Sequence, residues 1–87
     1  MTKMQFIVFP PHEFVVDEIE AREWSRQQFM AMTGFSFREC QRLLNGGTRI
    51  DHPVAKKLAK AFGTSVTLWI RLQRSYDAGQ GVARSGG

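Results

Sequence analysis

Side chains that could bind a polar partner lie together in the stretch MTGFSFRECQRLLNGG, residues 32–47. Arg38, Gln41 and Arg42 are three and four residues apart, the spacing that places side chains on one face of a helix. Arginine can donate two hydrogen bonds to guanine O6 and N7, and glutamine can pair with adenine N6 and N7. The simpler alternative is a solvated helix face, with Phe37 folded back into the core.

Other kinds of chemistry have little support in the sequence. The single cysteine, Cys40, excludes an intramolecular disulfide and a multi-cysteine zinc site, and its place on the apolar side of the same helix indicates core packing. His12 and His52 each lie beside a proline at a helix start and have no second ligand at metal spacing. No nucleophile–base pair, carboxylate pair or glycine-rich phosphate loop is found. We therefore expect no enzyme, no metal site and no cofactor.

The charge of the chain is unevenly distributed. The net charge is +4. Residues 1–24 hold two basic and five acidic residues, a net charge of −3, whereas residues 25–87 hold ten basic and three acidic residues, a net charge of +7. A basic body favours a polyanionic partner such as nucleic acid. A surface that is merely soluble would explain the same charge equally well.

Length and composition bound the class of protein. A chain of 87 residues with 43% hydrophobic content forms one domain, which buries roughly 60% of its unfolded surface. The longest apolar run in the body of the chain is only a few residues, so we expect no membrane span. The first fourteen residues, MTKMQFIVFPPHEF, lack the apolar run of a secretory signal. These features favour a cytoplasmic protein.

Helical periodicity continues through most of the chain. Ser25 with Gln28, and Ser36 with Glu39, have the spacing of capping boxes, and Asp51 can cap a further helix. The predicted helices cover residues 13–23, 26–33, 37–45, 52–62 and 66–78. In the first of them we expect Phe14, Val15 and Ile19 to face inward. Residues 1–12 are predicted to form an extended lead, residues 13–78 the folded domain, and residues 79–87 a flexible, glycine-rich tail.

The second and third helices are the informative pair. Each has about eight residues, and Gly34 lies in the turn between them, which is the pattern of a helix-turn-helix. A short turn makes the helices cross steeply, so that one can enter a DNA major groove while the other contacts the backbone. The sequence therefore predicts a compact all-α domain of five helices.

The chain also resembles a known family. WSRQQFMAMTGFSFRECQRLLNGGTRI resembles the helix-turn-helix of the Cro/repressor-like (XRE) superfamily. FPPHEFVVDEI and AKKLAKAFGTSVTLWIRLQRSYD are similar to the lead, first, fourth and fifth helices of HigA-family antitoxins. The chain departs from the pattern at Pro-His-Glu in the lead, at Arg26, at the bulkier Met30 and at Thr33. The resemblance covers about residues 8–78 and implies a lambda-repressor-like fold.

The resemblance also implies roles for individual residues. The outward face of the third helix would contact DNA bases, and the start of the second helix, with the loop after the third, would contact phosphates. For Arg49 the alternative is a merely solubilising side chain. The base-contact residues are Phe37, Arg38, Gln41 and Arg42, and the phosphate-contact residues are Ser25, Arg26, Gln27, Thr48 and Arg49.

The implied partners are double-stranded DNA with a palindromic operator, a second copy of the chain and a basic toxin. Tyr76 would contribute to a two-fold dimer contact. The acidic residues of the first helix would bind the toxin, repel DNA or simply face solvent; they are Asp17, Glu18, Glu20 and Glu23. The resulting hypothesis is an autorepressing antitoxin of a HigBA-like toxin–antitoxin module that neutralises a ribonuclease. A stand-alone XRE-type repressor and an interaction module without DNA binding are the alternatives.

Overall fold

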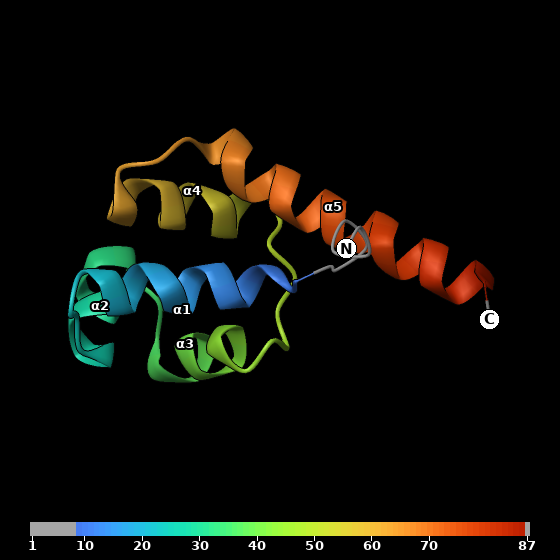
Figure 1. Ribbon diagram of the computed structural model, residues 1–87. Helices are drawn as coiled ribbons and strands as arrows, with labels where there is room; N and C mark the ends of the chain where they lie inside the picture. The colour runs from blue at the N-terminus through green and yellow to red at the C-terminus, as the bar shows by residue number, and fades with distance from the viewer. Residues whose placement is uncertain (1–8, 87) are drawn as a thin grey trace.

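A computed structural model describes residues 9–86, with side chains described for residues 9–79. The described chain is built from helices alone, without strands, as the sequence predicts. Figure 1 shows their arrangement. The helices are α1 (Pro11–Ala21), α2 (Arg26–Thr33), α3 (Phe37–Leu44), α4 (His52–Phe62) and α5 (Val66–Gly86).

The two predicted capping boxes are present. The Gln28 backbone nitrogen donates to Ser25 Oγ at 3.1 Å, and the Ser25 nitrogen donates to Gln28 Oε1 at 2.7 Å. At α3 the same reciprocal pair joins Ser36 and Glu39, at 3.1 and 2.8 Å. Each box satisfies two backbone donors that a helix start would otherwise leave unpaired. Local sequence therefore fixes where both helices of the pair begin.

The turn between α2 and α3 depends on Gly34. This residue has a φ of +85°, in the left-handed region that glycine adopts without a steric penalty. Its nitrogen donates to the Met30 carbonyl at 2.7 Å and so closes the last turn of α2. Thr33 Oγ1 accepts from the Phe35 nitrogen at 3.2 Å, which holds the chain as it leaves the turn. The turn thus sets the angle at which α3 leaves α2.

An aromatic stack forms the centre of the core. Phe62 of α4 lies 5.8 Å from both Phe29 of α2 and Trp69 of α5, measured between ring centroids, and 5.6 Å from Trp24. The Trp69 indole N–H donates to Thr64 Oγ1 at 2.8 Å, so its polar atom is satisfied inside the protein. The other buried members of this core cluster are Val15, Phe35, Cys40, Leu43, Ile50, Ala55, Leu58 and Ala59.

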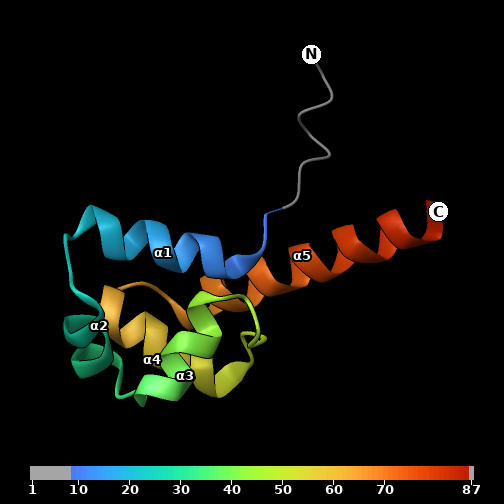
Figure 2. The ribbon, with the colours of Figure 1, turned by 90° about the horizontal axis from the view of Figure 1, so that it is seen from below.

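The arrangement leaves α3 accessible. α1 packs against α3 and α5, while α4 packs against α2 and α5. Figure 2, seen from below, shows α3 at the surface of this assembly, with the C-terminal half of α5 extending past the other helices. Within the described residues, no helix combines the length and the apolar character that a membrane span requires.

Several predicted boundaries are wrong. α1 begins at Pro11, not Glu13, because proline suits the first helical position, where its missing N–H is not needed. Phe14 lies at the surface with 36% of its area exposed, against the predicted inward position, whereas Val15 is fully buried. Of the predicted extended lead, residues 1–8 lie outside the described chain, and Pro11 and His12 are helical.

The tail that the sequence predicts to be flexible is helical in its described part. α5 continues through residues 79–86 as helix, and residue 87 lies outside the described chain. Glycine costs about 1 kcal/mol in a helix interior, but extending a helix that already exists adds a hydrogen bond for each residue. The glycine content alone was therefore a poor predictor of where α5 ends.

Candidate nucleic-acid interface

α3 has two chemically distinct faces. Cys40 and Leu43 are buried and hold the helix against the core, as predicted. Phe37, Arg38, Gln41 and Arg42 are all exposed on the other side. Phe37 in particular has 57% of its area exposed, so the alternative in which its ring folds back into the core is wrong.

The start of α2 lies beside the start of α3. The Arg26 guanidinium carbon is 5.9 Å from the centre of the Phe37 ring, within the range of a cation–π contact. Ser25, Arg26 and Gln27 are all exposed. The structure therefore brings the predicted phosphate-contact residues of α2 next to the predicted base-contact residues of α3. The contact with Arg26 also explains how an exposed aromatic ring is accommodated at this position.

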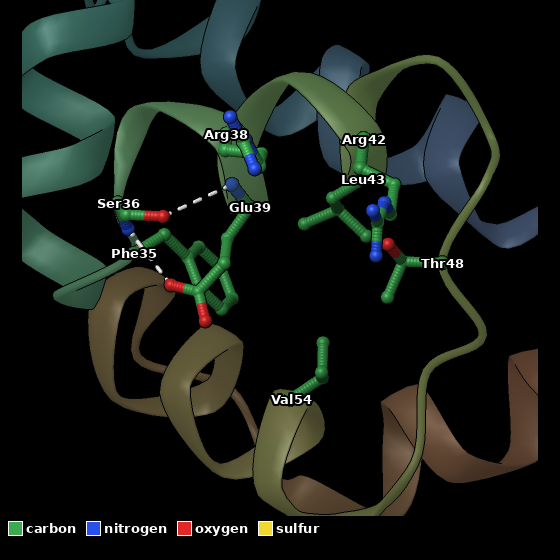
Figure 3. Close-up of a pocket in the computed structure, with 8 residues that line it drawn as sticks. All are labelled: Phe35, Ser36, Arg38, Glu39, Arg42, Leu43, Thr48 and Val54. Carbon is green, nitrogen blue, oxygen red and sulfur yellow. Dashed lines mark hydrogen bonds between the residues drawn. The ribbon is translucent and has the colours of Figure 1, made fainter.

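A groove of about 250 Å³ runs between α3 and α4. Figure 3 shows Arg38, Arg42 and Thr48 around it, with Val54 of α4 on the opposite side. Two of the predicted base-contact residues and one predicted phosphate-contact residue therefore lie around one hollow. Its remaining lining residues are Phe35, Ser36, Glu39 and Leu43.

Glu39 is the acidic residue at this groove. The Ser36 backbone N–H donates to its carboxylate, and this bond is the main reason that the pKa of Glu39 lies below its ordinary value. The Ser36 hydroxyl and the charge of Lys57 act in the same direction. The carboxylate is thus held in the capping box as an anion, and its role in helix capping accounts for an acidic residue on a face that is otherwise basic.

Arg49 has a partner that the sequence did not indicate. Its two terminal nitrogens donate to the two carboxylate oxygens of Asp77 on α5, at 3.0 and 2.7 Å. Gln73 donates to Asp77 Oδ1 at 3.0 Å and accepts from the Ile50 nitrogen at 2.8 Å. These bonds lower the pKa of Asp77, chiefly through Arg49, and raise the pKa of Arg49. The loop after α3 is thereby tied to α5.

The four acidic residues singled out on α1 differ in their surroundings. Asp17, Glu20 and Glu23 are exposed, whereas Glu18 is half-buried and forms an ion pair with Arg22 one turn later. Arg22 also donates to the Phe62 carbonyl at 2.9 Å, so this pair ties the end of α1 to the end of α4. Glu18 therefore has a structural role, and three carboxylates of the set remain open to a partner.

Tyr76 is half-buried beside a hollow formed where α5 meets the start of α1 and the loop after α3. His12 lies in the same hollow, with its ring against Gly46. This placement gives His12 a packing role, as predicted. Within residues 9–86, no three His, Cys, Asp or Glu residues lie close enough together to hold a metal ion. Cys40 is fully buried, and burial raises the pKa of its thiol.

The comparisons with known proteins agree with this geometry. A family model described as helix-turn-helix, HTH_3, matches residues 17–69, which include α2, the turn and α3. No curated protein and no solved structure matches the chain. The matched residues cover more than half of the chain, and the five helices form the compact lambda-repressor-like arrangement. The chain therefore belongs to the XRE-type helix-turn-helix family of sequence-specific DNA-binding transcription regulators.

Proposed function

We propose that the protein is the antitoxin of a HigBA-like toxin–antitoxin module, which represses its own operon at a palindromic operator and neutralises a ribonuclease toxin. The observation that carries the DNA-binding part is the exposed polar face of α3 above a buried apolar face. On this reading Arg38 and Arg42 pair with guanine, Gln41 pairs with adenine, and the Phe37 ring packs on a thymine methyl.

The phosphate contacts come from both sides of α3. The start of α2 offers free backbone N–H groups and the Arg26 charge, a combination suited to an anion. Ser25 and Gln27 add side-chain donors, and Thr48 and Arg49 contact the backbone beyond the groove. Because phosphates are the same at every base pair, these contacts fix the register of α3 and carry no sequence information.

The antitoxin part rests on two features. The segment covering α4 and α5 resembles the corresponding helices of HigA-family antitoxins, and α1 presents the exposed carboxylates of Asp17, Glu20 and Glu23. A toxin that cleaves RNA carries positive charge to hold its substrate, so an acidic helix complements it. An isolated gene without a basic neighbour would instead favour a stand-alone repressor.

A gel-shift titration on the DNA upstream of this gene tests the proposal. Replacing both Arg38 and Arg42 with alanine should remove about 1–3 kcal/mol of discrimination for each lost pair, so specific affinity should fall at least 30-fold, by about 2 kcal/mol or more. The matched control replaces Lys56 and Lys60, two exposed lysines of α4, with alanine and loses the same charge. We expect the control to keep its preference for upstream DNA over a random duplex.

The partner is tested with the product of the neighbouring gene. Co-purification with that product, lost when Asp17, Glu20 and Glu23 are replaced by their amides, would support the antitoxin role. If native protein binds upstream DNA but not the neighbour, the protein is a repressor without a toxin. Binding of the neighbour without any salt-dependent DNA binding would leave an interaction module.

A further inference from the structure

The ion pair between Arg49 and Asp77 engages the guanidinium that the proposed phosphate contact requires. Arg49 follows Thr48 in the loop after α3, and Asp77 lies on α5. Both terminal nitrogens of Arg49 donate to Asp77, one to each carboxylate oxygen. An arginine offers the same two-pronged edge to a phosphate. In the free protein, the Asp77 carboxylate therefore occupies the edge of the Arg49 guanidinium that a DNA phosphate would use.

This pair is better held than an ordinary surface ion pair. Gln73, only 6% exposed, donates to one Asp77 oxygen and accepts from the Ile50 backbone nitrogen. The carboxylate is thus fixed by a buried side chain that also holds the loop carrying Arg49. Surface pairs without such support contribute little, because two long side chains must be ordered in water. The pKa of Asp77 lies below its ordinary value, chiefly because Arg49 donates to it, so the carboxylate is charged at neutral pH.

DNA can meet this pair in two ways, and both are unfavourable to binding. A phosphate that takes the two-pronged edge must first displace Asp77. A phosphate that instead uses the three remaining N–H donors of the five on arginine lies next to the negative charge of Asp77. In that second case the pair is neutral and contributes little to the release of counterions.

We propose that Asp77 is an internal competitor for the DNA phosphate at Arg49, and that it lowers the affinity of the protein for DNA. The inference rests on the proposed function, since it takes Arg49 as a phosphate contact. Because the carboxylate belongs to α5 and the guanidinium to the loop after α3, a shift of α5 changes the charge that DNA meets. A partner that pulls Asp77 away would strengthen DNA binding.

The test compares Asp77→Asn, Arg49→Ala and the double variant with the native chain. Dissociation constants are measured over a range of salt concentrations, on upstream DNA and on a random duplex of equal length. Freeing one cation should tighten binding up to about 8-fold at about 0.1 M salt and steepen the salt slope by about 0.9. The affinity of Asp77→Asn should increase equally for both duplexes, because a phosphate contact does not depend on the DNA sequence. In the Arg49→Ala background the gain should vanish.

Two further variants separate this effect from others. Glu13→Gln removes the same charge from the exposed face of α1 and should give little gain. Asp77→Ser, which loses the carboxylate without introducing an amide, should give the same gain as Asp77→Asn. The melting temperature of each variant shows whether it is folded.

Four outcomes would overturn the inference. They are unchanged or weaker binding by both Asp77 variants, an equal gain in Glu13→Gln, a gain that survives loss of Arg49, and a complete absence of DNA binding. The first three leave the proposed function standing if native protein binds upstream DNA. If neither the native chain nor the Asp77 variants bind either duplex, the proposed function fails as well.

Discussion

The thiol of Cys40 reports whether α3 is packed against the core. The residue is fully buried on the side opposite to Arg38 and Arg42, so its side chain becomes accessible only when α3 moves away from the core. Burial raises the pKa of the thiol and outweighs the opposing charge of Arg26, which disfavours the reactive thiolate. Cys40 is therefore a built-in probe of whether α3, the proposed recognition helix, is packed against the core.

We expect the Cys40 thiol of the folded protein to react with iodoacetamide about 100-fold more slowly than in the urea-unfolded chain at the same pH. A factor of 100 corresponds to about 2.8 kcal/mol of opening free energy. Mass spectrometry of timed samples measures both rates. A folded-state rate close to that of the unfolded chain would contradict a docked α3.

At the residue scale, sequence reasoning succeeded where a pattern is local. Cys40 and Leu43 were correctly placed inward because they share one face of a short, capped helix. Phe14 was misplaced because its neighbour Val15 takes the buried position, and helical spacing allows either register. The pairing of Arg49 with Asp77 was missed because the two residues are 28 positions apart in the chain. Only the fold brings α5 next to the loop after α3.

At the scale of helices, starts were more predictable than ends. Ser25, Ser36 and Asp51 cap α2, α3 and α4 as their side chains and spacing indicated. The end of α5 was not predictable, since glycine only weakens a helix and does not forbid it. The start of α1 was placed two residues late, because the sequence offers Pro10 and Pro11 without a polar cap.

Gly34 and Gly46 allow the turns on either side of α3 to be compared. Both have positive φ, +85° and +84°. Alanine at Gly34 would meet open space and should cost about 1–2 kcal/mol for the left-handed backbone alone. A Cβ at Gly46 would lie 2.8 Å from His12 Cε1, so the ring must move, and Gly46→Ala should cost more than Gly34→Ala. Urea unfolding of both variants measures the difference.

The origin of the extra cost is tested in a His12→Ala background, where the clash is removed. There Gly46→Ala should cost about as much as Gly34→Ala, which is the behaviour of two residues in direct contact. If the cost of Gly46→Ala is unchanged in that background, the ring of His12 does not limit the turn, and α1 does not support the loop after α3.

For the whole molecule, the length of α3 limits how many base pairs one copy of the protein can contact. Eight residues make a helix about 12 Å long, which spans about four base pairs in a groove. A site of that length recurs far too often in a genome for one domain to regulate one operon. Two copies acting together double the length that is read. The predicted homodimer is therefore required by the proposed autorepression, and α5, which carries Tyr76 and extends past the other helices (Figures 1 and 2), is where we place its contact.

A dimer with fixed geometry makes a prediction about operator spacing. Its two recognition helices should meet half-sites about 34 Å apart, on one face of the DNA. Inserting about five base pairs between the half-sites turns the second one to the opposite face, so affinity should fall to that of a single half-site. An insertion of about ten base pairs restores the face but adds a full turn of distance, and a dimer held through α5 should not regain its affinity. Gel-shift titrations on the three spacings measure this dependence.

Replacing Tyr76 with alanine tests whether α5 carries the contact. The variant should lose affinity for the two-site operator and keep native affinity for one isolated half-site, because the recognition helix itself is untouched. Sedimentation should show that it has a weaker dimer. Affinity that is independent of spacing, or equal losses on one and two half-sites, would mean that the protein binds as separate monomers. In that case one α3 would have to provide the specificity alone, although the roughly four base pairs that it spans recur too often in a genome to mark one operon.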